Sequence, residues 1–180
     1  MRYPAYGLLP AFAVALALSG SGAAAGASVE PSPEARPADN RLNLNVHVYG
    51  FSYHTDRQGV RRSGLNNELN LGFGLNYAFH EDERGVGFVE AGFYRDSGSN
   101  RAKLAMVGYQ FKLGKRWRLG GALVGVDSPT YNRGRSFIAP LPIVTYDLGA
   151  VQLNAIYVPR YGDYNRFAVF GLYFGIPFGK

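Results

Sequence analysis

From residue 42 onward, apolar and polar positions alternate along the chain with a period of two. The clearest run, residues 67–79, reads NELNLGFGLNYAF, with Leu, Phe and Tyr at every second position and Glu, Asn, Gly and Ala between them. The same alternation recurs in residues 86–96 and 102–113. Because successive side chains of a strand point to opposite faces, each run predicts a strand with one apolar face and one polar or small face.

Repeating this reading along the chain predicts eight strands. Most are longer than the roughly 5–6 residues usual in soluble sheets, and they suit the about 9–11 residues of a tilted transmembrane strand. Longer polar loops alternate with shorter turns between them. This pattern predicts an all-β protein, an eight-stranded antiparallel transmembrane β-barrel of the bacterial outer membrane. The strands are expected over residues 42–54, 67–80, 86–96, 102–113, 117–127, 136–147, 150–160 and 166–178.

A soluble eight-stranded barrel of the lipocalin kind is the alternative, and there the large apolar residues would face inward. In this chain, the polar face of the strands is rich in Gly, Asn and Gln, and aromatic residues lie near the ends of the opposite, apolar face. Such positions suit the aromatic girdles of a membrane protein, which favours the membrane barrel. The aromatic residues concerned are Tyr77, Phe79, Trp117, Phe174 and Phe178.

The N-terminus predicts export. Residues 1–25 hold Arg2, a short apolar core and small residues that fit a cleavage site, so we expect a secretory signal peptide; a membrane anchor is the alternative. Residues 26–41 contain three prolines and read as a flexible lead-in, which leaves residues 42–180 for the barrel. Export disfavours nucleic-acid binding, so the net charge of +6 points instead to anionic lipid headgroups. The chain has no Cys, which excludes disulfides, thiolate zinc sites and a Cys nucleophile.

In an up-and-down barrel, every second connection lies at the same rim. The ends of the first and third predicted strands therefore place His54 beside Asp96 and Ser97, far apart in sequence. A Ser nucleophile needs an adjacent base, and His is the usual one. Taken locally, however, Asp96-Ser97 followed by Gly, Ser and Asn is ordinary turn chemistry, and a lone His can be structural.

Several short stretches resemble the PagP family, the outer-membrane lipid A palmitoyltransferases. They occur in the order of that family and together cover nearly all of residues 46–180, although each is short. The stretches are YHTDR (53–57), GFGL (72–75), RDSGSNR (95–101), PLP (140–142) and YVP (157–159). Three features depart from the family: its helix before the first strand is replaced by the Pro-rich segment, only one Trp is present, and Gln110 stands where the family often has Gly.

The resemblance implies that His54, Asp96 and Ser97 are catalytic, with His47 as a rival for the His. It also implies that Pro159 lies beside a lateral gap through which lipid enters, and that Gln110 stands at the floor of an acyl pocket. From their small size, we expect four glycines to give an alkyl chain room inside the barrel: Gly72, Gly74, Gly92 and Gly108. We expect loop arginines to bind lipid A phosphates, foremost Arg57, Arg101 and Arg133, with Arg61, Arg62 and Arg135.

The function implied is transfer of a palmitoyl or similar chain from a phospholipid to a hydroxyl of lipid A, by a monomer without cofactor or metal. Ser97 would act either as the nucleophile or as a donor to the oxyanion, and the sequence leaves both open. Two alternatives remain: a non-catalytic small barrel of the OmpX-like kind, and a lipid A deacylase. The usual His-x-Ser of such deacylases does not occur in this chain, which weighs against the second.

Overall fold

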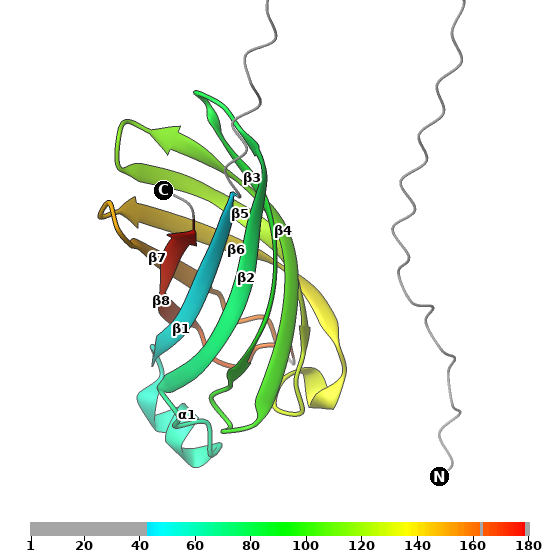
Figure 1. The fold of residues 1–180 in the computed structure, drawn as a ribbon. Coiled ribbons are helices and arrows are strands. Elements are labelled where there is room, and N and C mark those ends of the chain that lie inside the picture. Colours follow the sequence, from blue (N-terminus) through cyan, green and yellow to red (C-terminus); the bar gives the residue numbers. More distant parts are fainter. Residues whose placement is uncertain (1–42, 163, 179–180) are drawn as a thin grey trace, which may run out of the picture. The chain divides into compact units, whose positions relative to one another are not determined.

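The computed structural model describes residues 43–162 and 164–178, which form a closed barrel of eight antiparallel strands (Figure 1). Each strand pairs with the next, and β1 pairs with β8 to close the sheet, so the predicted fold class is confirmed. The predicted signal peptide and lead-in lie outside the described residues. The strands are β1 (Leu44–His54), β2 (Leu69–Glu81), β3 (Gly85–Arg95), β4 (Arg101–Leu113), β5 (Trp117–Asp127), β6 (Phe137–Asp147), β7 (Gln152–Val158) and β8 (Val169–Phe178).

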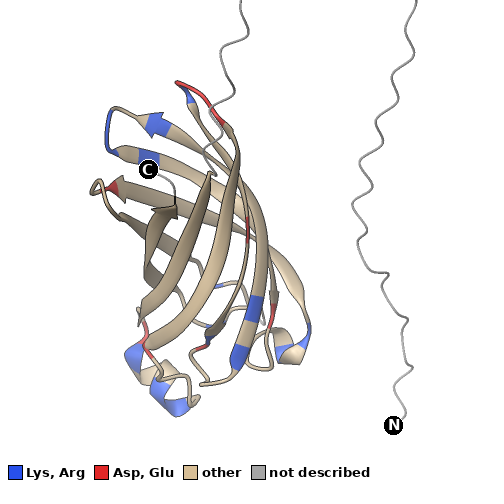
Figure 2. Ribbon diagram, viewed as in Figure 1, with Lys and Arg blue, Asp and Glu red and all other residues tan. Residues whose placement is uncertain are grey.

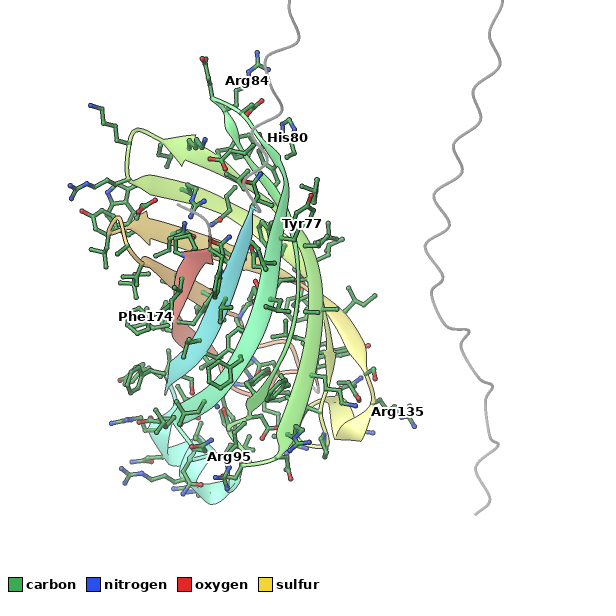
Figure 3. The ribbon with its side chains drawn as sticks, viewed as in Figure 1. Tyr77, His80, Arg84, Arg95, Arg135 and Phe174 are labelled. Carbon is green, nitrogen blue, oxygen red and sulfur yellow. The ribbon has the colours of Figure 1, made fainter. Side chains whose placement is uncertain are left out.

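The outer surface of the barrel is apolar. Along β2, exposed and buried residues alternate: Phe73 is 56% exposed, whereas the inward-facing Asn76 is 7% exposed. The five aromatic residues expected in girdles all lie on this outer surface, among them Tyr77 and Phe174 (Figure 3). A continuous apolar exterior of this size suits lipid rather than water, and closure leaves no unpaired strand edge in the hydrocarbon. The fold is therefore that of a transmembrane β-barrel.

The two ends of the barrel differ as the sequence predicts. Segments 55–68, 96–100, 128–136 and 159–168 cross one end, which we call the loop end, and short turns at 82–84, 114–116 and 148–151 cross the other, the turn end. Arg95 and Arg135 lie at the loop end, whereas His80 and Arg84 lie at the turn end (Figure 3). Lys and Arg residues lie in helix α1 and in other segments of the loop end, and others lie at the turn end (Figure 2).

The first loop contains a helix that the sequence reading did not anticipate. Helix α1 (Arg57–Arg62) begins at Asp56, whose carboxylate accepts a hydrogen bond from the Gly59 N–H at 2.8 Å, and it buries Val60. A Cβ at Gly59 would collide with the Asp56 carboxylate and the Phe167 ring, so a larger residue here would have to displace the Asp56 cap. A 3₁₀ turn, η1 (Asn132–Gly134), lies in the loop between β5 and β6. Among the described residues, no helix is long and apolar enough to cross a bilayer.

The barrel interior has two halves of different chemistry. Toward the turn end it is filled by polar side chains, as expected. Toward the loop end it is apolar, contrary to the expectation of a uniformly polar or small inner face. The apolar cluster consists of Phe88, Met106, Ala122, Val124, Val126, Leu141 and Ile143. The reason is visible in β5 and β6, where the runs ALVGV and FIAPLPIV carry apolar residues on both faces of the strand.

The wall of the barrel is incompletely paired between β6 and β7. Their ladder runs only from Asp147 with Gln152 to Ile143 with Ile156, whereas β6 pairs with β5 along its whole length. Pro140 lies two residues from Pro142, so their missing N–H groups fall on the same edge of β6. The described backbone of β6 from Phe137 to Pro142 therefore has no ladder partner on its β7 side.

Candidate functional site

His54 and Ser97 meet inside the barrel at the loop end. The Ser97 Oγ lies 3.2 Å from His54 Nε2, and the two residues are 3% and 5% exposed. His54 is the last residue of β1, and Ser97 follows β3 by two residues, so barrel closure rather than sequence proximity joins them. The distance suits a hydrogen bond through which the imidazole can take the hydroxyl proton.

His47 does not contact Ser97. It lies deeper, toward the turn end, where its Nδ1 is 2.8 Å from Glu90 Oε2. Of the two histidines considered from the sequence, the structure therefore brings His54 to Ser97. The turn end holds the third, His80, which is exposed and lies 3.4 Å from Asp82.

Asp96 is adjacent to this pair but faces another way. Its Oδ1 accepts backbone N–H bonds from Gly98 and Asn100, each at 2.9 Å, and its Oδ2 accepts the Ser128 hydroxyl at 2.5 Å. The carboxylate is 0% exposed and fully engaged by these donors. Within the described chain, His54 Nδ1 is buried without a hydrogen-bond partner, so Asp96 does not orient the imidazole directly. The sequence placed Asp96 at the right rim, but its partners come from its own turn and from the β5–β6 loop.

A carboxylate that the sequence reading overlooked lies at the loop end. This is Glu68, which lies between α1 and β2 and interacts electrostatically with His54. Glu68 is also held by Arg57, whose Nη2 lies 2.7 and 2.8 Å from its two oxygens. The Glu68 carboxylate is thus paired with a half-exposed arginine.

A cavity of about 170 Å³ opens beneath His54 and Ser97. Its walls are largely the apolar side chains of the loop-end half, including Met106, Val124 and Leu141, and Tyr49 and Tyr173 line its deep end. A dry apolar cavity of similar size holds a benzene-sized group, so this one accepts a short apolar segment. The hydroxyl–imidazole pair thus stands at the polar head of an otherwise apolar space.

The four glycines expected to make room for an alkyl chain do not line this cavity. The space over Gly74 and Gly92 is taken by the Tyr49 hydroxyl, and that over Gly108 by the Phe88 ring, whereas the backbone of the neighbouring strand at Phe93 and Tyr94 approaches Gly72. Groups of the chain itself fill the room that the missing side chains leave. The glycines allow close packing inside the barrel instead of an empty channel.

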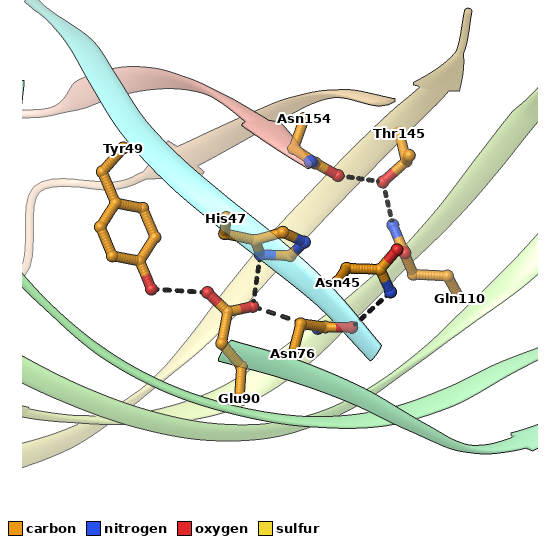
Figure 4. Close-up of polar contacts among 8 residues, drawn as sticks. All are labelled: Asn45, His47, Tyr49, Asn76, Glu90, Gln110, Thr145 and Asn154. Carbon is orange, nitrogen blue, oxygen red and sulfur yellow. Dashed lines mark hydrogen bonds and ion pairs between the residues drawn. The ribbon is translucent and has the colours of Figure 1, made fainter. Parts of the chain in front are cut away.

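Gln110 is likewise not the floor of the cavity. It belongs to the polar half, where its Nε2 donates to Thr145 Oγ1 at 2.8 Å and Thr145 donates to Asn154 Oδ1 at 2.6 Å (Figure 4). A second group is centred on Glu90, which accepts from the Tyr49 hydroxyl at 2.6 Å and from Asn76 Nδ2 at 3.2 Å. Tyr49 therefore joins the cavity to the polar half, and its hydroxyl is fixed by Glu90.

The arginines proposed for phosphate binding surround the loop end. Arg101 and Arg133 are exposed at the start of β4 and in η1, respectively. Arg57 is half-exposed but bound to Glu68, so it is not free to meet a phosphate without exchanging partners. Arg61 and Arg62 are exposed at the end of α1, and the first turn of that helix contains no acidic residue.

Pro159 follows β7 immediately, beside the unpaired stretch of β6. If the β6–β7 register continued, Pro159 would stand opposite Pro140, so prolines flank the opening on both sides. The cavity reaches this place, because Ala139 and Val158 are among the residues that line it. The PLP stretch was noted in the sequence, but its role beside Pro159 was missed.

In the part of the chain that the structure describes, no three His, Cys, Asp or Glu side chains are grouped to hold a metal ion. The chain matches no known family profile and no curated protein. Among solved structures it is similar to the outer membrane protein Ail of Yersinia pestis in a phospholipid bilayer nanodisc. That similarity has a TM-score of 0.45 and 13% identity over 76% of this chain and 99% of Ail. A similarity of this size says nothing about activity.

Proposed function

We propose that the protein is a lipid A acyltransferase of the bacterial outer membrane, which moves a palmitoyl or similar chain from a phospholipid to a hydroxyl of lipid A. The observation that carries this proposal is the pair of Ser97 Oγ and His54 Nε2, 3.2 Å apart at the head of an apolar cavity inside a membrane barrel. The resemblance of its sequence stretches to the PagP family supports the same chemistry.

Ser97 is the nucleophile in this proposal. As its Oγ bonds to the ester carbonyl carbon, His54 Nε2 takes the hydroxyl proton and the carbonyl electron pair moves onto oxygen. The intermediate collapses, the bond to the glycerol oxygen breaks, and that oxygen takes the proton from His54, which releases a lysophospholipid. A lipid A hydroxyl then gives its proton to His54 and attacks the acylated Ser97, whose oxygen leaves and recovers the proton.

The donor chain enters from the membrane through the unpaired stretch between β6 and β7. Because this chain already lies in hydrocarbon, it gains no hydrophobic transfer energy on entering an apolar cavity. Selection therefore depends on how well the chain fills the space between Val124 and the deep tyrosines. Access from the side also lets the headgroup stay at the membrane surface while only the chain enters the wall.

The acceptor is held by the basic rim. Lipid A carries phosphates, and exposed guanidinium groups bind phosphate oxygens in bidentate fashion. Four arginines are exposed at the loop end, where the cavity lies, and suit this role: Arg61, Arg62, Arg101 and Arg135. Arg57 contributes only if phosphate replaces Glu68 as its partner.

A non-catalytic small barrel is the second candidate, because the turn-end half is filled by a hydrogen-bonded network rather than hollow. Mass spectrometry of lipid A from cells that express the protein separates the possibilities. Gain of one acyl chain with the wild type, lost in His54→Ala and in Ser97→Ala but kept in the matched control His80→Ala, is expected. Loss of a chain would indicate a deacylase, and unchanged lipid A with all proteins folded would refute both enzymatic functions.

A further inference from the structure

Two tyrosines that neither the sequence reading nor the resemblance singled out converge on Ser97. Tyr131 lies in the β5–β6 loop, and its hydroxyl interacts electrostatically with Ser97 and with the Tyr94 hydroxyl. Tyr94 projects from the end of β3, and both tyrosines line the cavity together with His54 and Ser97. Two further hydroxyls thus share the space where an ester would have to lie for attack by Ser97.

The loop that carries Tyr131 is anchored to the turn that carries Ser97. Ser128 donates its hydroxyl to Asp96 Oδ2 at 2.5 Å, and Asn100 Nδ2 donates to Thr130 Oγ1 at 3.0 Å. The Thr130 N–H in turn donates to Ser128 Oγ at 3.0 Å, which fixes the backbone just before Tyr131. These bonds hold the loop that places Tyr131 near Ser97.

We propose that the Tyr131 hydroxyl is the oxyanion donor of the reaction, that the Tyr94 hydroxyl and the Ser97 backbone N–H hold its oxygen in place, and that Asp96 is a positioning residue that keeps the Tyr131 loop there. This inference rests on the proposed function. When Ser97 Oγ bonds to the ester carbon, negative charge develops on the former carbonyl oxygen, next to Ser97. Donors already aimed at that place stabilise the charge without rearrangement.

The Tyr131 hydroxyl suits the role of a donor. Burial raises the pKa of Tyr131, so its hydroxyl keeps its proton at every physiological pH and cannot serve as the general base. Its oxygen can accept from Ser97 N–H and from Tyr94 while its own proton is directed at the substrate oxygen. A hydroxyl whose oxygen accepts hydrogen bonds is polarised and donates more strongly. Asp96 then acts on catalysis through the loop rather than through His54.

The test uses Tyr131→Phe and Tyr94→Phe in the full barrel, reconstituted in vesicles of phosphatidylethanolamine with lipid A. Each change keeps the aromatic ring and removes one hydroxyl. Removing one oxyanion donor lowers kcat by about 10²- to 10³-fold in other enzymes, and we expect that loss for Tyr131→Phe with KM within about twofold of wild type. Tyr161→Phe, an exposed loop position that is 60% exposed, is the matched control and should keep full activity.

Binding measurements separate an oxyanion donor from a structural support. A long-chain phosphonate ester imitates the tetrahedral intermediate, whereas an ether-linked phospholipid imitates the unreacted donor. Tyr131→Phe should weaken the phosphonate by about the same factor as kcat and leave ether-lipid binding unchanged. Ser128→Ala, which removes the Asp96 contact of the loop, should produce a smaller loss of the same kind.

Three results would overturn the assignment. If wild type transfers acyl chains and both Phe variants, shown to be folded by their migration in unheated gels, keep its kcat, the Tyr131 hydroxyl is not the donor. If phosphonate and ether lipid are weakened equally, the tyrosines only support the cavity. A wild-type protein without transferase activity would overturn the proposed function itself, and this assignment with it.

Discussion

The buried carboxylate of Glu90 should be the largest single polar contribution to the stability of the barrel. Its side chain is 0% exposed and receives the Tyr49 hydroxyl at 2.6 Å and Asn76 Nδ2 at 3.2 Å, with His47 Nδ1 at 2.8 Å. Glu90→Leu keeps most of the side-chain volume but removes every acceptor. The variant therefore leaves two buried donors, the Tyr49 hydroxyl and Asn76 Nδ2, without their acceptor.

The expected loss follows from those two donors. Each buried donor left unsatisfied costs about 1–3 kcal/mol, so we expect Glu90→Leu to lower the free energy of unfolding by about 2–6 kcal/mol. The matched control is Glu68→Leu, where an exposed carboxylate loses only its contact with Arg57 and the expected change is about 0–1 kcal/mol.

The assay is guanidinium unfolding and refolding in detergent micelles, followed by the fluorescence of Trp117, the only tryptophan of the chain. Its position at the start of β5, at the turn end, makes it sensitive to the half of the barrel in which Glu90 lies. Free energies are extrapolated to zero denaturant for each variant. A Glu90→Leu loss below about 1 kcal/mol, or one no larger than that of Glu68→Leu, would refute the reasoning.

Three further outcomes are expected. The pKa of Asp82 is lowered chiefly by the hydrogen bond that its carboxylate accepts from the Gly85 N–H, so its contribution to stability is present above the usual Asp pKa and is lost as the pH falls through the lowered value. The stability difference between wild type and Asp82→Asn should therefore be constant near pH 7 and shrink in acid, and a difference that grows in acid would contradict this. Val124→Phe should fill part of the cavity and shift transfer to shorter acyl chains in the lipid A mass spectrum, and an unchanged chain distribution would show that the chain binds elsewhere. Pro142→Ala restores an N–H at the unpaired edge of β6, so acyl transfer should slow while amide exchange of that edge is more protected, and faster transfer would argue against entry between β6 and β7.

Sequence periodicity predicted the barrel well because its signal is physical and local. Phe73 faces the lipid and Asn76 faces the interior, and the same alternation is clear in β3 and β4. The rim shared by His54 and Ser97 was also predictable, since it follows from strand order alone. Helix α1 was not, because its few residues are ordinary loop residues and only the packing of Val60 and the Asp56 cap make them helical.

The interior was the part that the sequence predicted least well. A glycine on the inner face tells only that its own side chain is missing, and the ring that fills the space over Gly74 comes from Tyr49 on another strand. Asp96 shows the same limit, because its partner Ser128 follows β5 and lies near it only after the barrel closes. The sequence does show apolar residues on both faces of β5 and β6, and this pattern predicts an apolar half of the barrel interior.

The polar half of the barrel interior also determines whether ions and water can pass through the barrel. Side chains from six strands meet in the hydrogen-bonded half, with β1, β2 and β3 contributing to the Glu90 group and β4, β6 and β7 to the Thr145 group (Figure 4). These hydrogen-bonded side chains block the barrel interior, so the protein in a planar bilayer should show no ion conductance. They also close the apolar cavity to bulk water from the turn end, which in the proposed reaction would protect an acylated serine from hydrolysis and favour delivery of the chain to a lipid hydroxyl.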